Sequence, residues 1–163
     1  MRANLYPLSF LLSAWLWTSP AGAMVTVSFT NPERYTDIGW YRDEPNDEMK
    51  EIEAHLKRLG ERYLSPDQLL KIEVLDVDLA GTWSLSRRFG QGVRIMRGKS
   101  DWPRIELHYV LEAGGRVLVD QQEKVSDLGY PELQGGLHSS QSLPYEKQML
   151  DAWFRRRFTV QNP

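Results

Sequence analysis

Residues 69–79 read Leu-Leu-Lys-Ile-Glu-Val-Leu-Asp-Val-Asp-Leu, and this stretch decides the fold. Apolar and charged side chains alternate in it with the period of two that predicts a β-strand with one buried face. Positions 70, 72 and 74 are apolar, but the apolar set then moves to positions 75, 77 and 79. A β-bulge near Val74 and Leu75 would explain the change, because a bulge inserts one extra residue into a strand. The stretch therefore predicts one long, bent strand.

Two further stretches predict the clearest hairpin in the chain. Residues 104–111 and 116–125 both alternate apolar and polar side chains, and Ala113-Gly114-Gly115 lies between them. A three-residue loop with glycine at the left-handed position is typical of a type I turn followed by a bulge. Glu112 would pair with Arg116 beside this turn. The expected cross-strand pairs are Leu111 with Val117, Tyr109 with Val119, and His108 with Asp120.

Two segments have the apolar spacing of three or four residues that predicts amphipathic helices. The first runs from Asn46 to Tyr63, with acidic residues toward its start and basic residues toward its end, as the helix dipole favours. Gly60 is expected to cap its C-terminus. The second runs from Tyr145 to Phe158, and Pro144 can begin it because proline suits the first turn.

The remaining elements are shorter. Val25 to Phe29 alternates like a strand, Val93 to Arg97 predicts another strand, and Gly81 to Gly92 has the glycines and serines of a loop. The expected order is therefore strand, helix, four strands and helix. This order predicts an α+β domain, with a mostly antiparallel sheet of about five strands and two helices packed on one face.

The first 23 residues predict a secretory signal peptide. Arg2 precedes an apolar stretch from Leu5 to Trp17, and Ala21-Gly22-Ala23 follows as a cleavage site of small residues. The apolar stretch is too short for a membrane-spanning helix, which needs roughly 20 residues. Cleavage after Ala23 would leave Met24 first, with no cysteine for lipid attachment. We therefore expect residues 24–163 to form one periplasmic domain that is not lipidated and has no membrane span.

Composition narrows the classes of function. The chain has no cysteine, which excludes disulfides, thiolate metal sites and cysteine nucleophiles. The expected domain carries 22 acidic residues and all but one of the 20 basic ones. This balance disfavours nucleic-acid binding, because nucleic-acid binders usually carry a basic excess on one face. The sequence also lacks phosphate loops, dinucleotide fingerprints, nucleophile elbows and zinc-protease motifs, so no cofactor is expected.

Asp76 and Asp78 form the first candidate site. At alternate positions of a strand their carboxylates would share one face about 7 Å apart, since a strand rises roughly 3.3 Å per residue. Such a pair could bind a hard cation or divide acid and base roles. The alternative is a pair of solvated charges. We favour this alternative, because a metal site needs further ligands that the sequence does not place.

His108 and Asp120 form the second candidate site. The expected hairpin register places the imidazole across from the carboxylate, a pairing suited to acid–base catalysis. A cross-strand pair on a solvated face is the alternative, and we favour it here too. The spacing of the three histidines in the chain matches no metal-binding signature.

Four aromatic residues form the third candidate, a binding surface. Trp40, Tyr41, Trp83 and Trp102 all fall in expected loops. Rigid aromatic side chains in loops could recognise a protein or a glycan. They could equally close the ends of the sheet.

Three stretches together resemble a known family. They are residues 72–81, the strand at 104–111, and residues 143–150 followed by Trp153 and Phe154. In combination they are similar to an exported proteobacterial family, the domain of unknown function numbered three-zero-one-six, over nearly the whole expected domain. The resemblance implies a Gram-negative, periplasmic, single-domain protein, and it implies no activity, cofactor, partner or functional residue.

These observations favour a noncatalytic binding domain of the bacterial cell envelope. Its expected partner is another envelope protein or a small ligand, bound through the loop end of the domain. The alternatives are a small periplasmic hydrolase and a metal-binding protein. These would use Asp76 and Asp78, or His108 and Asp120.

Overall fold

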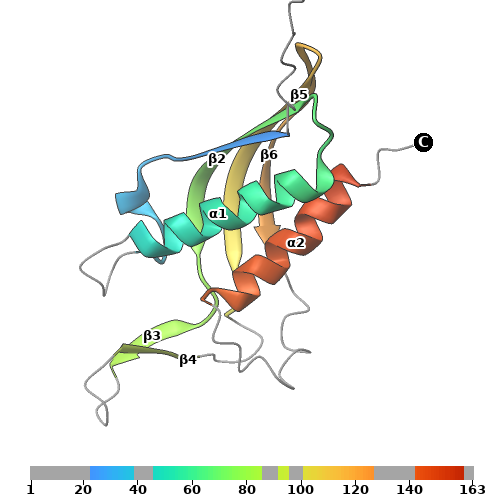
Figure 1. The fold of residues 1–163 in the computed structure, drawn as a ribbon. Helices are drawn as coiled ribbons and strands as arrows, with labels where there is room; N and C mark the ends of the chain where they lie inside the picture. The colour runs from blue at the N-terminus through green and yellow to red at the C-terminus, as the bar shows by residue number, and fades with distance from the viewer. Residues whose placement is uncertain (1–22, 39–45, 86–91, 96–100, 127–141, 160–163) are drawn as a thin grey trace, which may run out of the picture.

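The computed structural model describes residues 23–38, 46–85, 92–95, 101–126 and 142–159 (Figure 1). Its elements are β1 (Met24–Phe29), the short 3₁₀ helix η1 (Pro32–Arg34), α1 (Asn46–Tyr63), β2 (Gln68–Asp78), β3 (Thr82–Leu85), β4 (Gly92–Ile95), β5 (Arg104–Ala113), β6 (Arg116–Ser126) and α2 (Pro144–Phe158). Residues 1–22 of the expected signal peptide lie outside this description. Both helices are confirmed close to their expected bounds.

Four strands form the main sheet, in the order β1-β2-β5-β6. β1 runs parallel to β2, and the other neighbouring strands are antiparallel. The parallel pair is possible because α1 connects the two strands, as a parallel connection requires a long crossover. The α+β class is thus confirmed, but the main sheet is mixed and has four strands rather than about five.

β3 and β4 pair with each other in a separate two-stranded sheet. Figure 1 places this pair below the main sheet. The expected loop from Gly81 to Gly92 is therefore wrong at residues 82–85 and at Gly92. Serines and glycines around this short strand weaken its sequence pattern, and pairing with β4 supplies the backbone partners that make it a strand.

The bend in β2 is confirmed. β2 pairs with β5 in one register up to Val74 and in a register shifted by one residue from Asp76 onward, which leaves Leu75 unpaired with β5. The Val74 carbonyl accepts hydrogen bonds from the Thr30 backbone N–H at 3.0 Å and from the Tyr35 hydroxyl at 2.6 Å. The bulge thus keeps the buried side chains of Leu70, Ile72, Val74 and Val77 on one face of β2.

The hairpin of β5 and β6 is confirmed, but its register differs from the expected one by two residues. Ala113 pairs with Arg116, so the loop contains only Gly114 and Gly115, with φ of 56° and 74°. Two positive φ angles are the requirement of a type I′ turn, which glycine meets at little steric cost. A bulge between Leu111 and Glu112 then shifts the register. The observed pairs are Leu111 with Val119, Tyr109 with Gln121, and His108 with Gln122.

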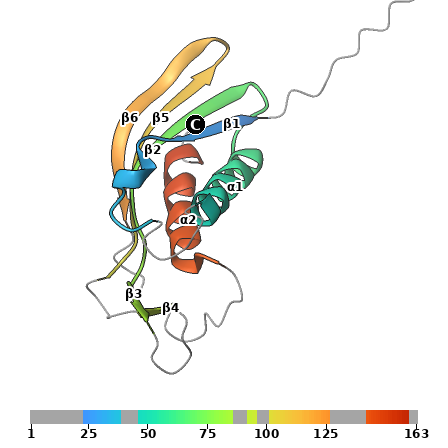
Figure 2. The same cartoon turned by 90° about the vertical axis from the view of Figure 1, so that its left-hand side faces the viewer.

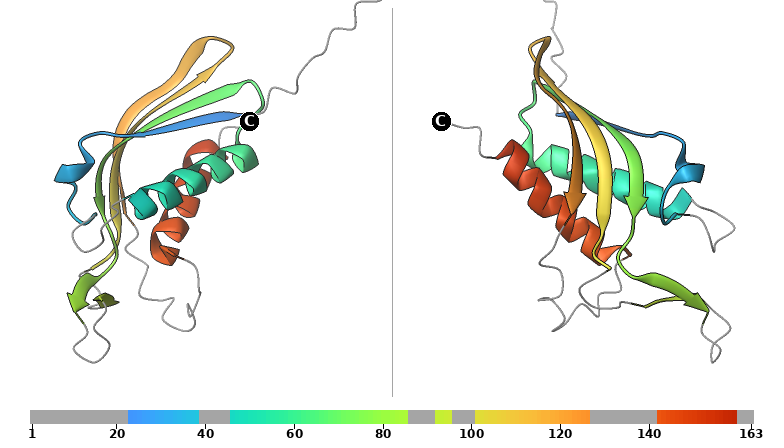
Figure 3. Two further views of the ribbon diagram at one scale, coloured as in Figure 1. Left: turned by 60° about the vertical axis from the view of Figure 1, so that its left-hand side comes forward. Right: turned by 180° about the vertical axis from the view of Figure 1, so that it is seen from behind.

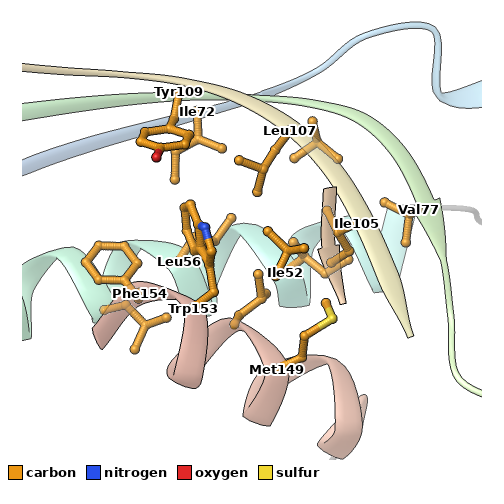
Figure 4. Packing of buried hydrophobic residues seen from close by; sticks show 14 of the residues in the cluster. Ile52, Leu56, Ile72, Val77, Ile105, Leu107, Tyr109, Met149, Trp153 and Phe154 are labelled. Carbon is orange, nitrogen blue, oxygen red and sulfur yellow. The ribbon is translucent and has the colours of Figure 1, made fainter. Parts of the chain in front are cut away.

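Both helices pack on the same face of the main sheet, which curves over them (Figure 2). α1 packs against β1, α2 packs against β6, and the helices contact each other. The core between these layers is rich in large side chains (Figure 4). The Tyr109 ring meets the edges of Trp153 and Phe158 at centroid distances of 5.4 and 5.8 Å. These aromatic contacts hold α2 against the middle of β5.

Gly60 does not cap α1, so this expectation is wrong. The helix continues past it to Tyr63. A Cβ atom at position 60 would lie only 1.9 Å from Cγ2 of Val25 on β1. Gly60 is therefore a packing residue, whose missing side chain lets the helix approach the strand closely.

A buried carboxylate attaches the start of α2 to the end of β2. Leu143 adopts a φ of 52°, and Pro144 begins the helix as expected. Glu146 in the first turn is only 2% exposed, and its Oε1 accepts the Ala80 backbone N–H at 2.7 Å. This acceptor satisfies a buried N–H, so the hydrogen bond ties the start of the helix to the segment that follows β2.

Polar contacts join the two helices at their exposed side. His55 Nε2 lies 3.1 Å from the Lys147 carbonyl oxygen and 3.1 Å from Oδ1 of Asp151. Burial lowers the pKa of His55, and the nearby Asp151 carboxylate only partly offsets this effect. A neutral imidazole can donate its one N–H to the carbonyl. Lys147 also donates to Glu51 at 2.7 Å, beside this contact.

Candidate functional site

The face of the main sheet opposite the helices is open, and the right-hand view in Figure 3 looks onto it. In the described part of the chain, strand alternation directs mostly charged and polar side chains to this face. We call it the open face. Its carboxylates are Glu73, Asp76, Asp78, Glu106, Glu112 and Asp120, and its permanent cations are Lys71, Arg104 and Lys124.

His108 joins three strands at the centre of the open face. Its Nε2 lies 2.7 Å from Oδ1 of Asp120 on β6, and its Nδ1 lies 3.8 Å from Oε2 of Glu73 on β2. The other Glu73 oxygen accepts a hydrogen bond from the Thr30 hydroxyl. His108 reaches Asp120 diagonally, because the residue directly opposite is Gln122. The contact between imidazole and carboxylate is therefore present, although the expected register was wrong.

Carboxylates at both nitrogens limit what His108 can do chemically. A catalytic base needs one nitrogen free to face the substrate while an orienting group holds the other. The Asp120 and Glu73 carboxylates lie at the two nitrogens of His108. The side chains are also solvated, with exposed fractions of 36% for His108 and 63% for Asp120. This geometry favours a cluster of polar contacts that links three strands over a catalytic dyad.

Asp76 and Asp78 share the open face but interact with different neighbours. Asp76 accepts hydrogen bonds from the backbone N–H and the hydroxyl of Thr36, both at 2.8 Å. Asp78 Oδ2 lies 3.7 Å from Nη1 of Arg104. Asp76 thus holds the segment after η1 against β2, and Asp78 links β2 to β5. Across the described ranges, no group of three or more potential ligands is arranged to hold a metal ion.

The structure describes the predicted aromatic surface only in part. Trp102 is half-buried, and the Arg104 guanidinium lies over its ring at 5.6 Å from the centroid. The Trp83 backbone is in β3, paired with Arg94. The Trp83 side chain, together with residues 40 and 41, lies outside the described part of the chain. The aromatic binding surface therefore stays a prediction.

A shallow hollow of about 340 Å³ lies on the open face over β1, β2 and β5. The outward-facing residues that line it are Thr26, Ser28, Lys71, Glu73, His108 and Val110. Its volume is at the lower end of the range for small-ligand sites, roughly 300–1,000 Å³. The two hydroxyls, the Glu73 carboxylate, the Lys71 and His108 side chains and the apolar Val110 thus surround a space that a single polar group can enter.

Glu73 and Lys71 belong to this site, and sequence patterns did not single them out. Pairing of β2 with β5 places Glu73 directly opposite His108. Lys71 donates to Glu112 at 2.8 Å, so Glu112 contacts β2 rather than its expected partner Arg116. The alternation of side chains along β2 before its bulge could have identified both residues. It directs Lys71 and Glu73 to the face of the sheet that carries His108.

A second charged cluster lies on the helix side of β6. Glu123 accepts hydrogen bonds from Arg157 at 2.9 and 2.6 Å and from the Trp153 indole N–H at 3.1 Å. Burial opposes the ionisation of Glu123, but these hydrogen bonds outweigh it and lower the pKa of the carboxyl. The cluster secures α2 to β6, so its role is structural.

Comparison with known proteins identifies a family and nothing closer. Within the residues that the structure describes, no helix is long and apolar enough to cross a membrane. No curated protein and no solved structure matches the chain. A family model described as "Protein of unknown function (DUF3016)" matches residues 23–156, from β1 into the last turns of α2. The chain therefore belongs to this family, the one that its sequence resembles.

Proposed function

We propose that the protein is a noncatalytic binding domain of the bacterial periplasm, and that its open face binds a cationic segment of another envelope protein. The charge of that face carries the proposal, since its six carboxylates outnumber its three permanent cations. A surface with a prevailing sign of charge attracts a partner of the opposite sign and orients it. The periplasmic location rests on the signal peptide expected at residues 1–23.

The hollow gives this surface a defined anchor point. A lysine or arginine side chain of the partner can enter it and meet the Glu73 carboxylate, since the Lys71 ammonium, which also lines the hollow, is paired with Glu112. The hydroxyls of Thr26 and Ser28 line the same space and can accept further hydrogen bonds. Rigid strands position all three groups, so little conformational entropy is lost when the partner binds.

The contact between His108 and Asp120 favours a second candidate function, a small hydrolase. Such an enzyme would require His108 to release one carboxylate and accept a proton from water or a hydroxyl. Asp120→Asn would then abolish a hydrolytic activity of the purified protein. Metal binding at Asp76 and Asp78 has weaker support, because both carboxylates would have to leave their contacts with Thr36 and Arg104.

Capture of partners from the periplasm tests the proposed function. The wild-type protein should retain a discrete partner, and raising the salt concentration should release it because exposed charges are screened. Glu106→Gln with Asp120→Asn should reduce the retained amount about tenfold or more, since it removes two charges from the open face.

The matched control removes two charges elsewhere. Asp47→Asn with Glu61→Gln changes exposed residues of α1 and leaves the open face intact, so it should retain the partner at the wild-type level. Equal loss of the partner in both double variants would show that net charge, and not the open face, determines binding. Retention by the open-face variant would remove the basis of the proposal.

A further inference from the structure

β6 is an edge of the main sheet, and within the described residues it pairs with β5 alone. An edge strand presents a row of free backbone N–H and C=O groups that another strand can bind. Two apolar residues of this strand, Val117 and Leu118, are 59% and 53% exposed. We propose that β6 pairs in antiparallel orientation with β6 of a second copy of this chain, which joins two main sheets into one.

The charges of β6 specify the register of this pairing. On the open face, Asp120, Gln122 and Lys124 follow one another at alternate positions. When a strand pairs with itself about a two-fold axis, residues at equal distances from the axis face each other. An axis at Gln122 therefore places Asp120 of each copy opposite Lys124 of the other. Two cross-strand ion pairs form in this register.

Neighbouring registers lack these ion pairs. Residues that lie directly opposite each other in antiparallel strands point to the same side of the sheet. The open faces of both copies therefore share one side only when the two-fold axis passes beside a residue and not between two residues. An axis at Asp120 or at Lys124 would place like charges directly opposite each other, which is destabilising. An axis at Gln121 or Glu123 would leave both charges opposite uncharged residues. One register is thus favoured over its alternatives.

Features that protect sheet edges fit this register. Charged side chains and bulges discourage an edge strand from pairing with arbitrary strands. Here the bulge leaves Leu118 without a partner on β5 and limits the regular strand to the residues that follow it. In the proposed register Leu118 comes opposite Ser126, the last residue of β6 in the second copy. The exposed edge of β6 therefore pairs more favourably with β6 of a second copy than with other strands.

Sedimentation of the purified protein over a range of concentrations tests this pairing. The wild type should show a reversible equilibrium between monomer and dimer. Asp120→Lys alone and Lys124→Asp alone each place like charges at both contacts, and each should weaken the dimer about 100-fold. The double variant D120K/K124D restores opposite charges in the same register, and it should dimerise within about tenfold of the wild type.

Glu61→Lys is the control, because it reverses a charge at an exposed position of α1 and leaves the sequence of β6 unchanged. It should leave the dimer unchanged, and circular dichroism should show all variants folded. A wild type that is monomeric at every concentration would overturn the proposal, whether or not another protein binds the edge. It is equally overturned if the single variants dimerise like the wild type, or if the double variant does not recover.

Discussion

Replacement of Gly60 by alanine should destabilise the protein, although the same change stabilises most helices. Gly60 lies inside α1, where alanine is favoured by roughly 0.8–1 kcal/mol in helix propensity. The added Cβ would lie 1.9 Å from Cγ2 and 3.2 Å from Cβ of Val25. Val25 is β-branched and buried in β1, so its side chain cannot turn away easily.

The expected size follows from these opposing effects. Overpacking of a buried contact costs about 1–3 kcal/mol. After the gain in helix propensity, Gly60→Ala should lower the free energy of unfolding by about 1 kcal/mol. In a Val25→Ala background Cγ2 is absent, and Gly60→Ala should then raise the free energy of unfolding by up to about 1 kcal/mol. The coupling between the two positions is therefore about 2 kcal/mol, within the range for residues in contact.

Urea denaturation of the four proteins in this cycle measures the coupling. Ala54→Gly, at an exposed position of the same helix, is the control for propensity alone and should cost about 1 kcal/mol. The close approach of α1 to β1 would be refuted if Gly60→Ala stabilised the wild type by as much as Ala54→Gly destabilises it.

Three further predictions concern buried polar groups. Glu146→Ala should lower the free energy of unfolding by about 1–3 kcal/mol in urea denaturation, because the buried Ala80 N–H loses its acceptor, and Glu146→Gln should cost less because it keeps an acceptor oxygen. Thermal stability should fall as the pH is lowered through about 6.5, because burial lowers the pKa of His55 in the folded protein, while the unfolded chain keeps a pKa near 6.5 and gains the proton first; His55→Gln should flatten this part of the profile. At alkaline pH, stability should instead fall as the pH rises. Burial raises the pKa of Tyr35 to about 12, so the contribution of this residue to the free energy of unfolding is complete below pH 10 and is lost toward pH 12. Tyr35→Phe should remove this part of the loss.

The contrast between β2 and β6 shows what the sequence could predict. The bulge in β2 was predictable because apolar residues on both sides of it must all face the core, so the change of phase is visible in the sequence. β6 has no such constraint, since Asp120 to Lys124 is entirely polar. Its register depends on the turn, where Ala113 can belong either to the loop or to the strand. The structure has the shorter loop and a bulge at Leu111 and Glu112.

The site and the packing depend on contacts that are distant in sequence. Contact between His108 and Asp120 was predictable because both residues lie in one hairpin. Glu73 joins them only through the pairing of β2 with β5, which the local pattern does not specify. Gly60 illustrates the same limit. A glycine near the end of a helix is typical of a cap, and only the position of β1 shows that it is a packing residue instead.

Site-specific photocrosslinking in cells that produce the protein tests the central claim, the location of the binding surface, most directly. A photoreactive residue replaces Val110, which lines the hollow on the open face, or Ala54, which is exposed on α1. We predict a discrete adduct with a second protein from position 110 and none from position 54, and the mass of the adduct separates a partner from a second copy of this chain. Adducts from position 54 alone, or equally from both positions, would contradict binding through the open face.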